Sequence, residues 1–271
     1  MRAILAALAL LLLAAGAARA QAPVSRYVTA SDGVRLHVLE AGQGPAVVLL
    51  HGATGSAEAN YVRTGILQAL AARHRVIALD WRGHGESQRP HSPRRYAADR
   101  FPRDVLEVMD QLGVERAHVA GYSLGGEMLA PLLALAPERL LSATFGGSGL
   151  LDPDPARDAA AAAKDAAGRD RDPPPLAARL WTGPDAEAMR AMFEGRRLQP
   201  PTTPPLDPAR VGFPVLGIIG EYDRPHRLST LLERTLPDFR LVVLKGRDHG
   251  TALADPAYRE TLVEFINAHD P

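Results

Sequence analysis

A serine between two closely spaced glycines constrains the fold of this chain more than any other sequence feature. It is Ser123, at the centre of Gly121-Tyr122-Ser123-Leu124-Gly125, with a short apolar run before it and a helix-compatible stretch after it. A serine on a sharp turn from a strand into a helix has strained backbone geometry, so the residues two before and two after it must be very small. The turn exposes the hydroxyl and directs the N–H groups of the following helix at whatever the serine attacks. The pattern therefore predicts a nucleophilic serine at the end of a buried strand.

Short apolar runs recur along the chain and predict a parallel sheet. They are rich in Val, Leu and Ile without polar alternation, as expected for strands that are buried on both faces. Before them, Tyr27–Glu40 indicates a hairpin around the turn sequence Ser31-Asp32-Gly33. The runs are Ala46–Leu50, Val76–Leu79, Ala117–Ala120, Leu140–Gly146, Val215–Ile219 and Leu241–Leu244.

Helix-compatible segments lie between most of these runs. The last begins at Asp255-Pro256, an N-cap acid followed by a proline in the first turn, and extends to His269. Strands that alternate with helices indicate an α/β fold with a doubly wound, mostly parallel sheet. The other helical segments are Glu58–Ala72, Pro102–Gly113, Glu127–Ala136 and Leu228–Leu236.

The first twenty residues have the layout of a secretory signal peptide. Arg2 gives a positive start, Ala3–Ala15 is an uninterrupted run of Ala, Ile and Leu, and a small-x-small cleavage triplet ends at Ala20. The alternative is a membrane anchor, but Ala3–Ala18 is shorter than the ~20 residues that a spanning helix needs. No later segment is apolar enough to span a bilayer. We therefore expect an exported protein, periplasmic or secreted, without stable membrane insertion.

Composition argues against several classes of function. Residues 21–271 carry 29 Lys and Arg against 31 Asp and Glu, which gives no electrostatic attraction for nucleic acid or an anionic membrane. The chain has no cysteine, so disulfides, a thiolate nucleophile and a thiolate metal site are all impossible. His84 and His91 lack a third convergent metal ligand, and there is no Gly-x-Gly-x-x-Gly or Gly-Lys-Ser/Thr nucleotide loop. We expect no metal, no cofactor and no nucleic-acid partner.

One interval, Asp152–Val211, interrupts the alternation of strands and helices. It is rich in Ala, Pro, Arg and Asp and could be a flexible linker. However, Leu176–Trp181 and Met189–Phe193 carry apolar residues at helical spacing, which a solvated linker does not need. We therefore expect a helical lid at 152–211, inserted between two parts of the core at 21–151 and 212–271. Four of its apolar residues are candidates for a substrate pocket: Trp181, Met189, Met192 and Phe193.

A serine nucleophile needs a general base, which is usually a histidine. His249 lies just past the last apolar run, in a loop that Gly246 and Gly250 flank. The glycines allow this loop to bring the imidazole over the edge of the sheet. We therefore assign the base to His249.

The histidine in turn needs a carboxylate that orients it. Asp223 directly follows the apolar run Val215–Ile219, and the chain order serine, aspartate, histidine is one of the three known for such triads. We choose Asp223. The alternatives are Glu221 on the same loop, and Asp152 or Asp154 after the preceding run.

A tetrahedral intermediate also needs two N–H donors for its oxyanion. Leu124, the residue after the serine, should supply one of them. The other should come from the loop that follows Ala46–Leu50, where glycines let the backbone approach the site. We choose Ala53 there, with Thr54 as the alternative, and interpret His51 as a residue that braces the loop.

Residues 27–269 resemble the α/β-hydrolase fold superfamily. The landmarks occur in one order: His51-Gly52, Asp80–Ser87, the turn at Ser123, then Asp223 and His249. The resemblance implies that Asp80–Ser87 forms a structural turn beside the site, and it fits a lid inserted after the run Leu140–Gly146. Many relatives have a small or apolar residue where this chain has Glu127, and the sequence leaves open whether Glu127 faces solvent or the site.

The resemblance implies a serine hydrolase that cleaves an ester or related acyl bond of a small molecule through an acyl-enzyme. Members with an aspartate nucleophile, such as haloalkane dehalogenases and epoxide hydrolases, are unsuitable models because the residue at the turn is Ser123. The same triad could instead open a lactone, hydrolyse a carbon–carbon bond or catalyse perhydrolysis. A non-catalytic ligand-binding protein on this scaffold is the alternative from another class.

Overall fold

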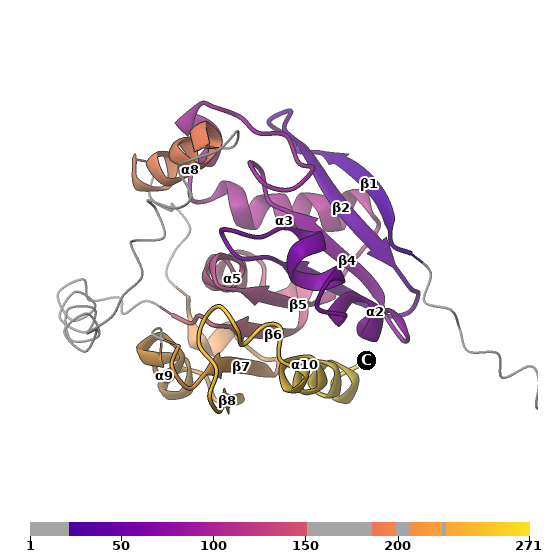
Figure 1. Ribbon diagram of the computed structural model, residues 1–271, viewed down its shortest axis with the longest axis vertical. Coiled ribbons are helices and arrows are strands. Elements are labelled where there is room, and N and C mark those ends of the chain that lie inside the picture. Colours follow the sequence, from indigo (N-terminus) through magenta and orange to yellow (C-terminus); the bar gives the residue numbers. More distant parts are fainter. Residues whose placement is uncertain (1–21, 151–185, 199–205, 224–225) are drawn as a thin grey trace, which may run out of the picture.

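A twisted, eight-stranded, mostly parallel sheet forms the centre of the molecule (Figure 1). The computed structural model describes residues 22–150, 186–198, 206–223 and 226–271. Within them the strand order is β1-β2-β4-β3-β5-β6-β7-β8, and β2 alone runs in the direction opposite to the other strands. The strands are β1 Val24–Thr29, β2 Arg35–Ala41, β3 Ala46–Leu50, β4 Arg75–Asp80, β5 Ala117–Tyr122, β6 Leu140–Gly146, β7 Val215–Gly220 and β8 Phe239–Leu244. The doubly wound α/β fold expected from the sequence is confirmed.

The N-terminal hairpin is also confirmed. Strands β1 and β2 pair from Val24 opposite Glu40 to Thr29 opposite Arg35. The turn between them contains Gly33 with φ of 84°, a left-handed conformation that glycine adopts without steric cost.

Both faces of the sheet are covered, which explains the continuous apolar runs in the sequence. Successive side chains of a strand point to opposite faces. In β3, Val48 and Leu50 therefore pack in one apolar cluster, while Val47 and Leu49 pack in the other. Helices α3, α5 and α9 contribute to the first cluster, and α2 and α10 to the second.

The helices follow the expected segments to within three residues at their ends. The segment Glu58–Ala72 forms two short helices instead of one. Gly65, between them, has φ of 73°, a left-handed conformation that interrupts the helix. The segment predicted to start at Glu127 starts instead at Leu124, directly after the serine. The elements are η1 Glu58–Val62, α2 Ile66–Ala71, η2 Pro93–Tyr96, α3 Arg100–Gln111, α4 Leu124–Glu127, α5 Leu129–Leu135, η3 Pro137–Arg139, α8 Ala186–Leu198, η4 Pro208–Arg210, α9 His226–Thr235 and α10 Pro256–Ala268.

The last helix has the cap that the sequence indicated. The Asp255 side chain accepts a hydrogen bond of 2.8 Å from the backbone N–H of Ala257, and Pro256 occupies the first helical position. This arrangement satisfies a backbone donor that no intrahelical carbonyl can reach.

Part of the expected lid is a helix. Helix α8 lies against η2, where Gly195 packs so closely on Pro93 and Tyr96 that a methyl group there would collide with them. Residues 151–185 and 199–205 lie outside the described residues, as do the expected signal peptide and Trp181. The boundaries 152–211 therefore stay a prediction. Across the described ranges, no helix is long and apolar enough to cross a membrane.

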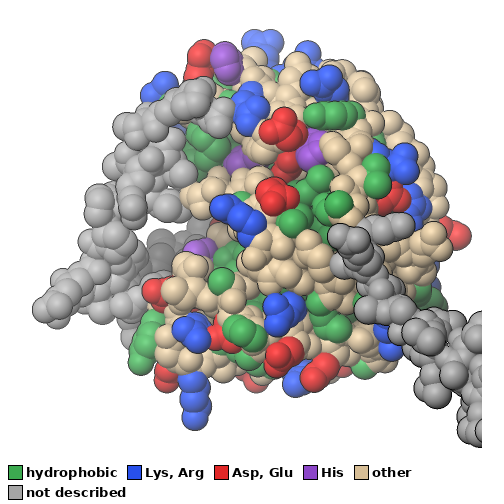
Figure 2. All heavy atoms as spheres, turned by 45° about the vertical axis from the view of Figure 1, so that its right-hand side comes forward, with side chains coloured by type: hydrophobic (Ala, Val, Ile, Leu, Met, Phe, Trp, Pro, Cys, Tyr) green, Lys and Arg blue, Asp and Glu red, His purple; other side chains and the backbone are tan. Residues whose placement is uncertain are grey.

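Acidic and basic side chains are interspersed on the surface. Figure 2 shows blue and red groups side by side over the visible face, with scattered apolar side chains between them. No large patch of a single sign is visible on this face.

Candidate active site

The sharp turn after β5 holds Ser123 in a conformation that few side chains adopt. Its φ is 54° and its ψ is −116°, and it is the only non-glycine residue among those described that has a positive φ. The surrounding structure maintains this strain, because the Ser123 N–H donates a 2.8 Å hydrogen bond to the Gly146 carbonyl at the end of β6. The hydroxyl therefore sits at the carboxyl edge of the sheet.

The glycines of the motif are required by close backbone approach. A Cβ at Gly121 would collide with the backbone of Gly125, and a Cβ at Gly125 would collide with the Leu50 carbonyl of β3. Gly126 was not assigned from the sequence, yet a Cβ there would overlap the Ser148 hydroxyl. Its position beside the motif was the only available signal.

The structure brings Ser123, His249 and Asp223 into one hydrogen-bonded chain. The Ser123 Oγ lies 2.9 Å from His249 Nε2. On the other side of the ring, His249 Nδ1 lies 3.0 and 3.1 Å from the two carboxylate oxygens of Asp223. The three side chains lie on the loops after β5, β7 and β8. These loops meet because parallel strands end at the same edge of the sheet.

The surroundings of His249 favour its protonated form. Burial acts to lower its pKa, but the hydrogen bond and charge of Asp223 outweigh it, with smaller contributions from Glu127 and Asp248. The pKa of His249 is therefore raised from its ordinary value. Because a carboxylate only accepts, the neutral ring carries its proton on Nδ1, and its Nε2 is free to accept the Ser123 hydroxyl.

The alternative acids do not occupy this position. Glu221 is exposed and accepts a 2.8 Å hydrogen bond from the Gly246 N–H, which ties together the loops after β7 and β8. Asp223, by contrast, is buried against the imidazole. Asp152 and Asp154 lie outside the described residues.

The loop after β3 passes directly beside the serine. A Cβ at Gly52 would lie 3.2 Å from Ser123 Cβ. Among the described residues, the backbone N–H groups of Ala53 and Leu124 donate no hydrogen bond. Both predicted oxyanion donors are therefore still available, while Thr54 is exposed on the same loop.

Buried side chains brace this loop. His51 Nδ1 lies 2.7 Å from the Gly52 carbonyl, and its Nε2 accepts a hydrogen bond from the Trp81 N–H at 3.1 Å. Burial lowers the pKa of His51 to about 3, so the ring is neutral and structural, as interpreted from the sequence. His84 Nε2 contacts the Ala53 carbonyl at 2.8 Å, and Asn60 accepts from the Gly52 N–H at 2.9 Å.

Tyr122 supports the base and was missed by the sequence reasoning. Its hydroxyl donates a 2.6 Å hydrogen bond to the His249 carbonyl, and its ring stacks on the imidazole at 5.3 Å between centroids. No sequence signal identifies it, because this contact joins residues that are 127 apart in the chain.

The predicted pocket residues on α8 are mostly core. Met189 and Met192 are buried in the apolar cluster that also contains α3, and Phe193 is partly buried against it. Glu127, whose orientation the sequence left open, is half exposed and pairs with Arg196 of α8 at 3.1 Å. An ion pair therefore joins the helix behind the serine to α8.

The sequence model of the alpha/beta hydrolase fold family matches residues 45–211, which are more than half of the chain. The chain belongs to the alpha/beta hydrolase fold family. This membership agrees with the resemblance seen in the sequence and with the observed strand order.

Similar proteins within the alpha/beta hydrolase fold family have different activities by name. The chain is 33% identical to bifunctional epoxide hydrolase 2 of Mus musculus over 130 residues, which are 48% of this chain and 23% of that protein. It is 38% identical over 129 residues to the dihydrolipoyllysine-residue acetyltransferase component of the acetoin cleaving system of Pseudomonas putida, covering 47% of this chain and 33% of that one. The chain thus matches a third or less of the length of these two curated relatives.

A solved structure covers far more of the chain. The 2-hydroxy-6-oxo-6-phenylhexa-2,4-dienoate hydrolase of a Rhodococcus species superposes with a TM-score of 0.67 at 25% identity, over 90% of this chain and 99% of that one. The alpha/beta hydrolase fold therefore extends over nearly all of the described residues.

Proposed function

We propose that this protein is a serine hydrolase that cleaves an ester or related acyl bond of a small molecule. The observation that carries the proposal is the hydrogen-bonded chain from Ser123 through His249 to the buried Asp223, built on a strained turn. A serine hydroxyl is a weak nucleophile at neutral pH, and this arrangement provides the base and the orienting carboxylate that it needs.

In the proposed reaction, Ser123 Oγ attacks the acyl carbon while His249 Nε2 takes its proton. The imidazolium then gives that proton to the leaving alcohol, and an acyl ester of Ser123 remains. Water, activated by the same imidazole, hydrolyses this ester and restores the serine. Asp223 keeps the proton on Nδ1 and stabilises the imidazolium without being protonated itself.

The backbone N–H groups of Ala53 and Leu124 are the proposed oxyanion donors. Leu124 is the first residue of α4, where helical N–H groups have no intrahelical acceptor. His84 and His51 hold the opposite loop by its carbonyls, so its N–H groups stay directed by rigid, buried side chains. Donors fixed before the reaction stabilise the developing charge without a cost of reorganisation.

Similarity to epoxide hydrolases does not transfer their reaction to this chain. Epoxide hydrolases were set aside as models because they belong to the members with an aspartate nucleophile, and this chain has Ser123 at the turn. The matched segment covers less than half of the chain. We therefore assign acyl chemistry to this site.

Carbon–carbon bond hydrolysis is the second candidate. It is favoured by the likeness to the dienoate hydrolase, whose named substrate contains a ketone and no ester. The same triad could act at a ketone carbon. Lactone opening, perhydrolysis and ligand binding without catalysis remain further alternatives, and no contact in the described residues favours any of them.

A fluorophosphonate probe tests the proposal directly. It should form an adduct on Ser123, located by peptide mass mapping, and the S123A variant should lack that adduct. A panel of 4-nitrophenyl esters of increasing chain length would then define the acyl preference. A folded wild-type protein without an adduct on Ser123 would instead support ligand binding without catalysis.

We also propose that the protein is exported after cleavage at Ala20. The apolar run behind Arg2 and the small-x-small triplet support this proposal. Intact mass of the exported product should begin at Gln21. A full-length product that stays in the cytoplasm would contradict it.

The interval 152–211 is proposed to act as a lid. Helix α8 supports this proposal because it is tied to the helix behind Ser123 through Arg196 and Glu127. Replacing 152–211 by a short Gly/Ser linker should leave a folded core with altered ester preference. If the variant does not fold at all, the interval is part of the core.

A further inference from the structure

A second Ser–His–Asp arrangement lies at the β1 side of the sheet. Ser25 Oγ is 2.7 Å from His37 Nε2, and His37 Nδ1 is 2.8 Å from Asp80 Oδ2. The order of the atoms is the same as in the site around Ser123, where the corresponding distances are 2.9 and 3.0 Å. None of the three residues belongs to that first site.

Strand register creates this arrangement. His37 of β2 lies opposite Tyr27 on one side and opposite Asp80 of β4 on the other. Ser25 is two residues before Tyr27 on β1, so both side chains point to the same face. From there the Ser25 hydroxyl reaches the imidazole diagonally.

The hydrogen bonds around Asp80 determine which nitrogen of His37 carries the proton. Asp80 accepts hydrogen bonds from the N–H groups of Ala57 and Glu86 as well as contacting His37. Burial acts to raise the pKa of Asp80, but these hydrogen bonds outweigh it and lower the pKa, so the group is a carboxylate. His37 Nδ1 therefore donates to it, and Nε2 accepts the Ser25 hydroxyl.

Burial divides the roles within this group. His37 and Asp80 are 3% and 2% exposed, whereas Ser25 is exposed on the edge strand. A fixed base and a fixed carboxylate thus lie behind an accessible hydroxyl. This is the combination that a nucleophilic serine needs.

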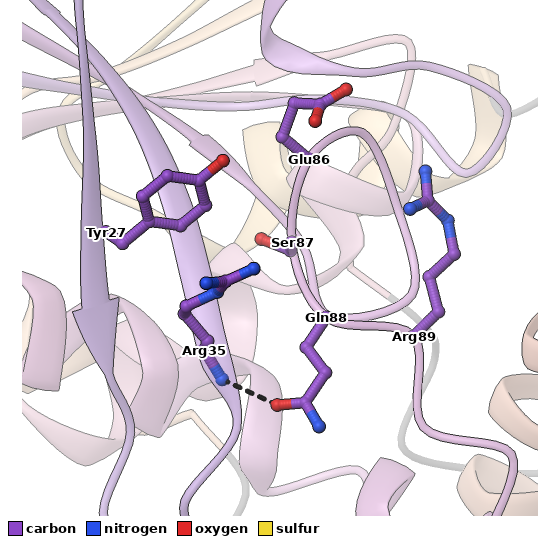
Figure 3. A pocket seen from close by; sticks show the side chains of 6 residues that line it. All are labelled: Tyr27, Arg35, Glu86, Ser87, Gln88 and Arg89. Carbon is purple, nitrogen blue, oxygen red and sulfur yellow. Dashed lines mark hydrogen bonds between the residues drawn. The ribbon is translucent and has the colours of Figure 1, made fainter.

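A pocket of about 560 Å³ lies next to the group, separated from it by residues that contact His37, and none of its lining residues belongs to the Ser123 site. Its wall includes Tyr27, whose ring is 5.2 Å from the His37 ring, and Ser87, whose hydroxyl accepts the His37 N–H at 2.7 Å. Figure 3 shows the Arg35 and Tyr27 side chains on one side, Arg89 on the other and Glu86 above them. The lining residues are Tyr27, Arg35, Glu86, Ser87, Gln88 and Arg89.

The pocket wall carries two guanidinium groups, those of Arg35 and Arg89, and one carboxylate, that of Glu86, so its net charge favours an anionic ligand. The Arg35 guanidinium lies 4.5 Å from the centre of the Tyr27 ring, and no carboxylate of the described residues pairs with it. Arg26 of β1, by contrast, is paired with Glu40. Of these two arginines, Arg35 is therefore the one that can bind a carboxylate of a ligand.

We propose that Ser25, His37 and Asp80 form a second nucleophilic centre, which accepts acyl groups from small esters that carry an anionic group. Ser25 Oγ attacks the acyl carbon and its proton passes to His37 Nε2. The bond to the alcohol then breaks, and the alcohol leaves with that proton. Water hydrolyses the acyl-Ser25 ester, again through His37. Ser25 is not on a strained turn before a helix, so its acylation is slower than that of Ser123.

The test uses the S123A variant, which removes the first nucleophile. Fluorophosphonate and mono-(4-nitrophenyl) succinate should each give an adduct on Ser25 in peptide mass mapping, and S123A/S25A should give none. Adding H37Q to S123A should slow the labelling of Ser25 by a factor on the order of 100, as loss of a general base does. The H37Q and S25A single variants should still be labelled at Ser123, which shows that they are folded.

One further measurement keeps the test decisive. In the S123A background, the rate of Ser25 acylation by mono-(4-nitrophenyl) succinate is compared with that by 4-nitrophenyl acetate. Arg35→Gln should reduce this ratio of rates by about tenfold, and the control Arg26→Gln should leave it unchanged. An absent Ser25 adduct, or one that forms independently of His37, would overturn the proposal without affecting the assignment of Ser123.

Discussion

Asp223→Asn is the substitution that examines the proposed triad most sharply. The Asp223 carboxylate has no exposed surface, and both of its oxygens lie within 3.1 Å of His249 Nδ1. Asparagine has nearly the same shape, so packing is preserved. However, its amide can donate to Nδ1, which moves the ring proton to Nε2 and removes the acceptor for the Ser123 hydroxyl.

The expected loss in kcat is on the order of 10⁴, because the base survives but is held in the wrong tautomer. At 1.36 kcal/mol for each factor of ten, this equals about 5.4 kcal/mol of transition-state stabilisation. The loss should be smaller than that from removing the serine, since the oxyanion donors and the imidazole both remain.

The pH dependence of activity is a second, independent test of the role of Asp223. Burial lowers the pKa of His249, and the hydrogen bond and charge of Asp223 are the main effects that raise it. The base acts only when it is neutral, so the activity of the wild type falls as pH drops through this raised pKa. In D223N burial is no longer opposed by Asp223, and the acidic limb of kcat/KM should move to lower pH.

The assay is steady-state hydrolysis of a 4-nitrophenyl ester between pH 4 and 9, with thermal unfolding of each variant as the folding control. Glu221→Gln is the matched control, because Glu221 is on the same loop but binds the Gly246 N–H. Both E221Q and D152N should retain nearly full activity. A D223N enzyme within tenfold of wild type, or a crippled D152N, would refute the assignment of the acid.

Three further predictions follow from other contacts. S123A and H249A should each lower kcat by about six orders of magnitude, and the double variant should add little, because the groups act as a unit. Glu127 contributes to the raised pKa of His249 and pairs with Arg196. Loss of the negative charge in E127Q should therefore move the acidic limb of kcat/KM to lower pH, and loss of the positive charge in R196Q should move it to higher pH. Shifts of both variants in the same direction would contradict this. Asp104→Asn removes one of the two carboxylates that pair with the fully buried Arg82 guanidinium, the other being Asp32, so urea unfolding should show a loss of about 1–3 kcal/mol. An unchanged midpoint would disprove the argument.

The strands could be located from the sequence because burial on both faces leaves a direct trace in it. The runs Ala46–Leu50 and Leu140–Gly146 have the bounds of β3 and β6, since every residue in them is buried except Leu141, which is half-buried. Helix boundaries were less accurate. Gly65 divides one expected helix through a left-handed turn, which depends on local packing rather than on apolar periodicity.

The serine turn and the loops that carry Asp223 and His249 could be located from the sequence because strands, turns and glycines obey local rules. Which side chains meet is a different question, since it depends on strand order and register. The partnership of Glu127 with Arg196 joins residues 69 apart, and that of Tyr122 with His249 joins residues 127 apart. Ser25, His37 and Asp80 form a group only because β1, β2 and β4 are neighbours in the sheet. Local chemistry in the sequence determined where a nucleophile could be, and the tertiary structure decided which bases, acids and charges surround it, because those contacts are set by sheet register across long separations in the chain.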